Sequence, residues 1–306
     1  MNALLKTVGR GVGYTVLRVS LAVTPLFPLS ALQWVGRRTG DLIRIASRHR
    51  RAIADRNLRI AFRDELSARE RANIAAESFR QFGMFPFECM KFGGLSNEQV
   101  LPLIVADEEH ERAVNDLFSR GRGVIFVSAH YGNFELAARY VAILGHPVVA
   151  VVRSARDSRT TDLMNRLRRK NGMVAVRRDV AARPMVAALR RGECVAILAD
   201  QNSEDIYVPF FGQPTGTVDG PARLSLHTGA PIVIGICSRQ AGGRYRLTAE
   251  AVIEPDRSQD RESEVRRITT EINDALEKAI RREPSQWLWF HNRWRSSPDV
   301  VVPVDA

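Results

Sequence analysis

The sequence has few cysteines, and no two of them are close together. Cys89, Cys194 and Cys237 are the only three in 306 residues, and none has the short spacing of a redox or metal-binding motif. Disulfide bonds are therefore not expected, which is typical of a protein in a reducing, cytoplasmic setting. Cys194 and Cys237 stand in apolar runs, where we interpret them as small buried side chains.

Metal-binding patterns are missing as well. There is no HExxH motif, and the histidines at 110, 130, 146, 227 and 291 form no close ligand pairs. We therefore expect no metal and no other cofactor. Internal repeats, low-complexity tracts and Gly/Ser linkers are also absent, so residues 51–306 are predicted to form one catalytic domain.

Acidic residues are too few to balance the basic ones. There are 34 Asp and Glu against 45 Lys and Arg, which gives a formal net charge of +11. Such a surface attracts anions, and nucleic acid, acidic phospholipid and acidic proteins are all candidates. No recognised nucleic-acid module and no platform of interleaved aromatic and basic residues occurs, so we expect no nucleic-acid partner.

Only one apolar run approaches the length of a membrane span. Residues 19–36 read VSLAVTPLFPLSALQWVG, without a formal charge, which is near the lower limit for a helix that crosses a bilayer. Pro25 and Pro28 interrupt this run. Gln33, Trp34 and a basic stretch follow instead of a small-residue cleavage site, so we expect a permanent membrane anchor and not a signal peptide.

The charges that flank the run predict its orientation. Basic residues are denser after it than before it, which favours a cytoplasmic position for residues from 37 onward. A single span and a kinked helix lying in one leaflet both satisfy this pattern, and a buried core helix is the alternative. We assign residues 1–50 to the membrane anchor and its basic flank.

Short β-branched runs alternate with helical patterns through the rest of the chain. Strands are predicted at residues 123–129, 147–153, 194–200, 231–238 and 245–253, with helices over 51–92, between the strands, and over 262–282. This alternation predicts an α/β fold with a mostly parallel sheet flanked by helices. Ligands bind at the carboxyl ends of the strands in such folds.

The turn after the first of these strands carries the chemistry. His130 and Glu135 are five positions apart, about 140° around an ideal helix, so they can face each other only across a turn. Gly132 permits a tight backbone, and Asn133 is the expected N-cap of a helix that begins near Phe134. Histidine is the usual general base for a hydroxyl, and a carboxylate on its other ring nitrogen fixes the tautomer. We predict that His130 and Glu135 form a catalytic pair; a structural histidine at a helix start is the alternative.

Further polar residues end the neighbouring strands at the same rim. Arg153 ends the second strand, where its charge can hold a phosphate or stabilise an oxyanion, and a solvated arginine is the alternative. Asp200 and Gln201 end the third strand, where we expect them to order the site and not to transfer protons. With Asn133, these residues form the expected substrate-binding set.

Several ordered motifs give the chain a family resemblance. The segments HYGNFE at 130–135, VPFFGQPTGTVDGPARLSLHTGAP at 208–231 and PSQWLWFHNRW at 284–294, with RNLRIAF at 56–62, together resemble the bacterial lipid A biosynthesis acyltransferases. These are the lauroyl and myristoyl transferases that act late in endotoxin assembly. The resemblance covers nearly the whole chain, including the apolar N-terminal run.

The resemblance implies a specific reaction. It implies a glycerolipid-acyltransferase-like fold, an acyl carrier protein thioester as donor, and a phosphorylated disaccharide lipid of the Kdo2-lipid IVA type as acceptor, at the cytoplasmic face of a bacterial inner membrane. It also implies an HX4D or HX4E motif, here His130 with Glu135. The family's Asp-Gln pair matches Asp200 and Gln201, and a functional arginine is expected at Arg153.

Three segments have two interpretations each. The nine Lys and Arg of residues 166–191 indicate a surface for phosphates, acidic lipids or an acidic carrier protein, or a solvated helix face. Residues 208–212 are predicted to line an acyl-chain tunnel, or to be plain core. The aromatic residues of 287–290, with Trp294, favour either a membrane interface or internal packing.

Two rival functions remain from the sequence. An acyl-CoA-dependent transferase acting on another glycolipid, such as a phosphatidylinositol mannoside, shares the HX4D/E logic. A basic, non-enzymatic protein that binds membranes or nucleic acid fits the charge alone.

Overall fold

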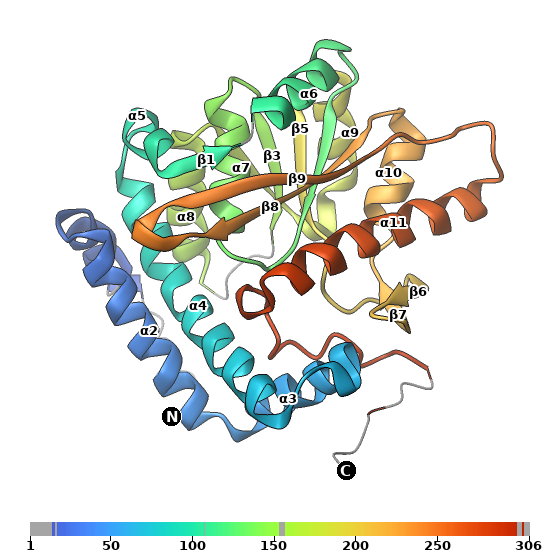
Figure 1. Ribbon diagram of the computed structural model, residues 1–306. Helices are drawn as coiled ribbons and strands as arrows, with labels where there is room; N and C mark the ends of the chain where they lie inside the picture. Colours follow the sequence, from blue (N-terminus) through green and yellow to red (C-terminus); the bar gives the residue numbers. More distant parts are fainter. Residues whose placement is uncertain (1–13, 16, 107, 153–156, 299–301, 303–306) are drawn as a thin grey trace, which may run out of the picture.

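A seven-stranded sheet lies at the centre of the molecule (Figure 1). The computed structural model describes residues 14–15, 17–106, 108–152, 157–298 and 302. The strands follow the order β1-β9-β8-β2-β5-β3-β4. Their bounds are β1 Ile104–Ala106, β2 Val124–Ser128, β3 Val148–Val152, β4 Met173–Arg177, β5 Cys194–Leu198, β8 Ile232–Arg239 and β9 Tyr245–Ile253.

The sheet is mostly parallel, as predicted. The five strands from β8 to β4 run parallel to one another, whereas β9 pairs with β8 in the antiparallel sense and β1 runs parallel to β9. All five predicted strands are confirmed. Two members were not predicted: β1 has only three residues, and β4 follows directly on a basic helix. The predicted α/β class is therefore correct, with one reversed edge.

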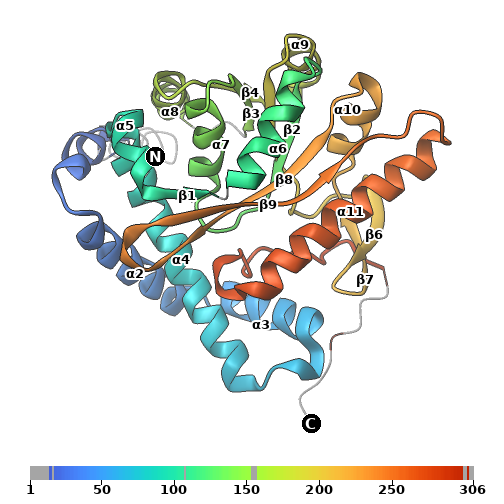
Figure 2. The ribbon, with the colours of Figure 1, turned by 45° about the horizontal axis from the view of Figure 1, so that its top comes forward.

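Helices cover both faces of the sheet (Figure 2). One face packs against α6 Glu108–Ser119 and α7 Phe134–Ile143, with α8 Ser158–Lys170 beside them. The other packs against α9 Ala182–Arg190, α10 Gly220–Thr228 and α11 Arg261–Arg282. Strand residues alternate between these two cores: Phe126 belongs to the first and Ile125 to the second. The covered faces explain why the central strands read as nearly continuous apolar runs.

The N-terminal helices lie together along one side of the molecule. They are α2 Leu29–Ala46, α3 Arg48–Phe62 and α4 Ala68–Gly94, followed by the short α5 Asn97–Val100. The helix α2 crosses α4 at glycines, because a Cβ at Gly36, Gly40 or Gly83 would lie 2.2–2.5 Å from backbone atoms of the other helix. Side-chain-free positions thus let the two backbones touch.

Of the two forms of anchor predicted for residues 19–36, a single span and a kinked helix in one leaflet, the single span is not supported. The helix that reaches Val23 gives way to a 3-10 turn over Thr24–Leu26, and Pro28 precedes the start of α2. The second half of the run belongs to α2, which continues through charged residues to Ala46. Within the described chain, no helix combines the length and apolar character that crossing a bilayer requires.

The two aromatic segments are internal. Residues 206–217 form a hairpin of β6 Ile206–Phe210 and β7 Gln213–Thr217, and its two phenylalanines pack against the C-terminal tryptophans. The buried aromatic cluster is Phe62, Phe210, Phe211, Trp287, Trp289 and Trp294, each at most 5% exposed. Of the two interpretations given for each segment, the burial of these side chains favours plain core for residues 208–212 and internal packing for the tryptophans.

Candidate active site

The catalytic turn connects β2 to α7 in five residues. Gly132 has a φ of 52°, and a Cβ there would lie 2.0 Å from the carbonyl oxygen of Cys237, so a side chain has no room. The amide of Asn133 donates to that same carbonyl at 2.9 Å. The Asn133 side chain accepts from the amide of Leu136 at 3.0 Å, which confirms it as the N-cap of α7.

His130 projects from this turn and is bonded to Asp200. The ring Nδ1 lies 2.8 Å from Oδ1 of Asp200, and the backbone amide of His130 donates to Oδ2 of the same carboxylate at 2.8 Å. A carboxylate only accepts, so in the neutral tautomer that fits this bond Nδ1 carries the hydrogen and Nε2 is the acceptor. The side-chain amide of Gln201 lies 3.3 Å from Nε2. This is the arrangement of a general base with a fixed tautomer.

Asp200 is held in its charged form although it is 2% exposed. Trp287 donates its indole hydrogen to Oδ2 at 2.9 Å, beside the two bonds from His130. Burial raises the pKa of Asp200, but the electrostatic attraction of the His130 ring and these three hydrogen bonds outweigh burial and hold that pKa below its ordinary value. Asp200 therefore orients His130 from inside the protein and has no free face for substrate.

Glu135 does not supply the carboxylate bonded to the His130 ring, contrary to the predicted pairing. Its oxygens bind Arg168 of α8 in a two-point ion pair, with Oε2 3.1 Å from the guanidinium Nη2. The charge of Glu135 overcomes burial and raises the pKa of Arg168. The reason is geometric: Glu135 lies in the first turn of α7, where α8 passes, whereas Asp200 ends the strand beside β2.

A cavity of about 1080 Å³ opens beside His130. Its polar and basic lining residues, which we call the mouth, come from helices as well as loops: Arg50, Arg168, Arg178, Gln201, His291 and Arg295. One half continues between the sheet and α7, and the other reaches Met185 of α9 and Pro221 of α10. Glu135 lines the cavity too. A polar mouth with apolar depths suits a ligand that has a charged head and an apolar tail.

His291 lines this mouth in its neutral form. Burial lowers its pKa to about 4, and its Nε2 accepts a hydrogen bond from the amide of Asn202 at 3.2 Å. No three His, Cys, Asp or Glu side chains of the described residues group as a metal site would require.

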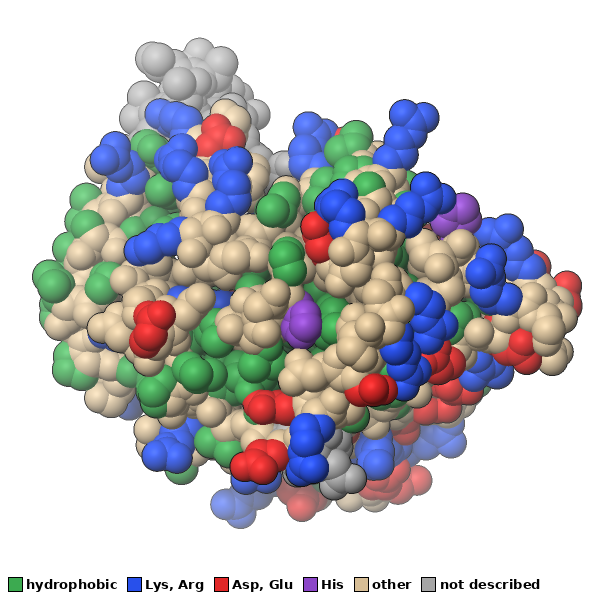
Figure 3. Space-filling view, turned by 90° about the horizontal axis from the view of Figure 1, so that it is seen from above, with side chains coloured by type: hydrophobic (Ala, Val, Ile, Leu, Met, Phe, Trp, Pro, Cys, Tyr) green, Lys and Arg blue, Asp and Glu red, His purple; other side chains and the backbone are tan. Residues whose placement is uncertain are grey.

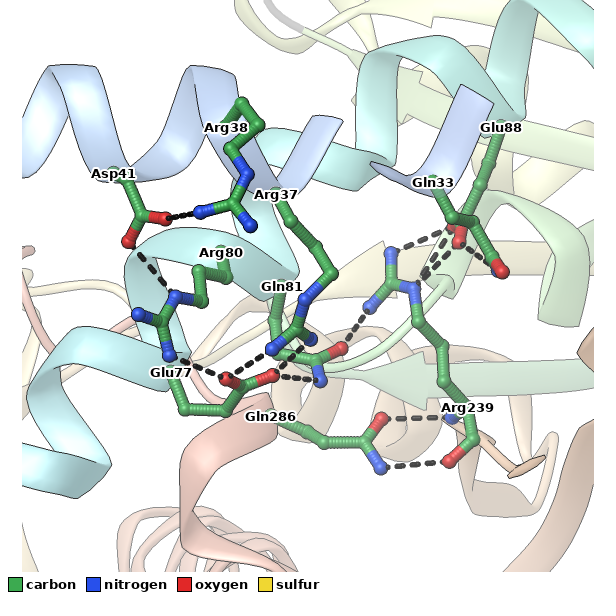
Figure 4. Close-up of polar contacts among 10 residues, drawn as sticks. All are labelled: Gln33, Arg37, Arg38, Asp41, Glu77, Arg80, Gln81, Glu88, Arg239 and Gln286. Carbon is green, nitrogen blue, oxygen red and sulfur yellow. Dashed lines mark hydrogen bonds and ion pairs between the residues drawn. The ribbon is translucent and has the colours of Figure 1, made fainter. Parts of the chain in front are cut away.

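A buried ion pair lies beneath the catalytic turn (Figure 4). Glu88 of α4 is fully buried and accepts from the guanidinium of Arg239 at 2.7 Å, from Asn133 at 2.9 Å and from Gln33 of α2 at 3.1 Å. Gln286 binds the backbone of Arg239 through both of its side-chain polar atoms. The turn, α2, α4 and the end of β8 thus meet at one carboxylate. The sequence offered no signal for this pair, which joins residues 151 positions apart.

Comparison with known proteins identifies the family. The model of the bacterial lipid A biosynthesis acyltransferases matches residues 7–296. This chain belongs to that family. The chain is 28% identical over 276 residues to a lipid A biosynthesis palmitoleoyltransferase of Escherichia coli (strain K12), covering 89% of this chain and 87% of the relative.

Other relatives agree with this assignment. The chain is 28% identical over 288 residues to a lipid A biosynthesis acyltransferase of Haemophilus influenzae, covering 90% and 88% of the two chains. It is 26% identical over 283 residues to a lipid A biosynthesis lauroyltransferase of Escherichia coli (strain K12), covering 90% and 88%. The protein is therefore an acyltransferase, and its activity is acyl transfer in lipid A biosynthesis.

Of the remaining predicted site residues of the acyltransferase, the structure places only some at the cavity. Gln201 lies at the cavity beside His130. Asn133 is 1% exposed, and its side chain is hydrogen-bonded to the amide of Leu136 and the carboxylate of Glu88, so it does not face substrate. Arg153 lies outside the described residues.

The predicted basic run of the acyltransferase divides into paired and unpaired residues. Arg168 binds Glu135, Arg177 binds Asp179, and Arg191 binds Glu193. Arg178 lines the mouth of the cavity. The run thus contributes one wall of the site as well as solvated charge.

Proposed function

We propose that the enzyme transfers a fatty acyl group from an acyl carrier protein thioester to a hydroxyl of a phosphorylated lipid A precursor, of the Kdo2-lipid IVA type, with His130 as general base. The observation that carries this proposal is the His130–Asp200 bond. It leaves an unprotonated Nε2 at a cavity with a basic mouth and apolar depths. Family membership supplies the class of reaction.

The proposed chemistry needs no nucleophile on the enzyme. Nε2 of His130 takes the proton of the acceptor hydroxyl while its oxygen attacks the thioester carbon. The tetrahedral intermediate collapses, the carbon–sulfur bond breaks, and the leaving thiolate takes the proton back from the imidazolium. Asp200 stabilises the imidazolium through the Nδ1 hydrogen bond in the interval. The products are an ester and a free thiol.

Glu135 completes the proposed site indirectly. Its ion pair holds Arg168 at the cavity wall, where the guanidinium places a positive charge near the reacting groups. Arg50, Arg178 and Arg295 also line the mouth, and we assign to them the phosphates of the acceptor. In the undescribed segment after β3, Arg153 remains a proposed contributor to the same task.

We propose that the carrier protein and the membrane bind different surfaces of the enzyme. Lys and Arg side chains are spread over much of the face seen in Figure 3, which suits an acidic carrier protein. Hydrophobic side chains gather at its left edge, the side on which α2 lies in Figure 1. We infer that α2 lies in the cytoplasmic leaflet of the inner membrane.

The exposed face of α2 supports an interfacial anchor. Trp34, Leu42 and Ile45 are 60%, 66% and 64% exposed, whereas Leu32 and the glycines at 36 and 40 face α4. An apolar stripe of this size on the outside of a protein is expected to contact lipid. We keep residues 1–50 as the proposed anchor and residues 51–306 as the proposed catalytic domain.

Transfer assays with purified enzyme test the proposal. We expect ester formation on a lipid A precursor with an acyl carrier protein thioester, and a loss of about 10²- to 10⁴-fold in His130→Ala. Coenzyme A thioesters and phosphatidylinositol mannoside are included as the alternative donor and acceptor. Preference for those substrates would replace the proposed pair, and near-normal turnover in His130→Ala would remove the proposed base.

A further inference from the structure

The half of the cavity between the sheet and α7 is an apolar slot with a defined end. Its lining comprises Phe126, Ala138, Ala150, Met173 and Ala196. Strand pairing aligns Phe126 with Ala196, and Ala196 with Ala150, so these three side chains form one row across β2, β5 and β3. The small side chains of the two alanines leave space above β5 and β3, whereas the Phe126 ring fills the space above β2.

The next row, farther from His130, is separated from the slot on β2, β5 and β3. Val124, Cys194 and Val148 are aligned across the same three strands and are at most 1% exposed. None of them lines the slot. The same row continues at Met173 of β4, which is aligned with Val148 and does line the slot. An apolar chain that enters beside His130 and runs along the alanines is therefore stopped by the Phe126 ring over β2 and by the Met173 side chain over β4.

The Phe126 ring packs into space beside a glycine of the neighbouring strand. A Cβ on Gly235 of β8 would lie 2.2 Å from Cε2 of this ring, so the ring occupies space that only glycine leaves open. The pairing of β8 with β9 is irregular between Ile234 and Gly235, which marks a bulge at the same point. The ring thus packs directly against the backbone of Gly235.

Unfilled space lies on the other side of the ring. A second, small cavity of about 50 Å³ has Phe126 in its lining together with Val124, Val141, Cys194 and Gly235. Phe126 is common to this cavity and to the slot. The ring therefore forms a partition between two apolar spaces.

We propose that Phe126 sets the longest acyl chain that the enzyme transfers, by closing the apolar slot with its ring. This rests on the proposed function, because it takes the acyl chain of the donor to lie in the slot. Removing the ring would join the slot to the second cavity. Adding atoms at Gly235 or Ala196 would shorten the slot.

Competition among carrier-protein thioesters of increasing chain length tests this proposal. We expect Phe126→Ala to raise kcat/KM for chains longer than the wild-type preference, relative to the preferred chain, by about 10-fold or more. Ala196→Val is expected to shift the preference to shorter chains by a similar factor. Ala196→Val adds atoms and creates no cavity in the core. Its chain preference can therefore be measured even if Phe126→Ala fails to fold.

Ile125→Ala is the matched control. Ile125 is on the same strand and is fully buried, but it faces the opposite core. We expect lower stability and an unchanged chain preference. Folded, active Phe126→Ala and Ala196→Val variants with wild-type preference would overturn the proposal. Wild-type enzyme that transfers from no thioester would instead refute the proposed function.

Discussion

Asp200 accepts three hydrogen bonds, and each of its donors belongs to the catalytic region. Two come from His130 and one from Trp287. A carboxylate bonded in this way fixes both the position and the tautomer of the imidazole. Glu135, five residues after His130, makes its described bonds to Arg168 instead.

Asp200→Asn is predicted to lower turnover by about 10²- to 10⁴-fold. The amide would donate to Nδ1 and move the ring hydrogen to Nε2, which then cannot accept a proton. Glu135→Gln is also expected to impair transfer, through Arg168, but to leave the hydrogen on Nδ1. Nitrogen-15 NMR of the histidine rings distinguishes the two, and wild-type tautomers in Asp200→Asn would contradict the assignment.

His291 is predicted to make the protein sensitive to acid. Its pKa is about 4 in the folded state, below its ordinary value of about 6.5, so the unfolded chain binds the additional proton between these values. Stability therefore falls as the pH falls from about 6.5 to about 4. The lowered pKa of Asp200 adds a further loss at the acid end.

Urea unfolding at a series of pH values measures this effect. His291→Gln keeps an acceptor for the amide of Asn202 and removes the titration, so its stability should change less between pH 6.5 and pH 4 than that of wild type. Parallel curves for the two proteins would show that the acid sensitivity arises elsewhere.

Site residues were predicted correctly where a short, continuous stretch of sequence defines them. The His130 turn, its Asn133 cap and the Asp200–Gln201 strand end were all found from sequence, because a strand that ends in polar residues before a helix is a local pattern. The partner of the imidazole depends on which strands become neighbours. The β2–β5 pairing that brings Asp200 to His130 is not local.

Glycine decides how the N-terminal helices pack. Gly83 of α4 lies where a Cβ would be 2.2 Å from the carbonyl oxygen of Gly36 and 2.6 Å from the amide nitrogen of Gly40. The same helix has Gly93, where a Cβ would make ordinary contacts at 3.6 Å with the side chain of Leu167. Two glycines of one helix thus have different reasons to be there.

Gly83→Ala is predicted to destabilise the fold by about 1 to 3 kcal/mol, because α2 and α4 would have to move apart. Gly93→Ala is the matched control and should be neutral or stabilising by up to about 1 kcal/mol, since alanine favours a helix. Thermal unfolding compares them. Equal effects of the two substitutions would show that helix propensity, and not the close crossing, dominates.

Elements with strong periodicity were predicted, and elements made by long-range pairing were not. The five apolar strands and the closing helix carry their own patterns. The hairpin of β6 and β7 includes Pro209, Pro214 and Gly216, residue types that are rare in strands. Its pairing is stabilised by contacts with residues far along the chain, such as Asn273 and Arg293. Local propensity is overridden there by packing.

The whole molecule presents one apolar stripe to its surroundings on α2. Polar bonds beside that stripe tie the helix to the body, for example the two-point bond of Arg37 to Glu77 shown in Figure 4. Gln33 of α2 also reaches the buried carboxylate of Glu88. A surface that contacts lipid would therefore be rigidly attached to the catalytic turn.

Replacing Leu42 and Ile45 together by Glu is predicted to weaken binding to vesicles of acidic phospholipid about 10-fold or more, because the lipid contacts proposed for these two exposed apolar side chains are lost. The fold should be kept, since both side chains are exposed. Val174→Glu, at an exposed apolar position of β4, is the control and should bind as wild type does. Vesicle sedimentation measures both, and unchanged binding of the double variant would exclude α2 as the lipid contact.

The bond between Trp287 and Asp200 also has a consequence during synthesis. The indole is added 87 positions after the carboxylate that it stabilises. At ordinary translation rates, roughly 4 to 17 s pass between the two, during which the nascent chain contains His130 and Asp200 without the indole. Asp200 therefore receives its third hydrogen bond only after the C-terminal segment has been made, so the full set of bonds that holds the His130 ring forms late in synthesis.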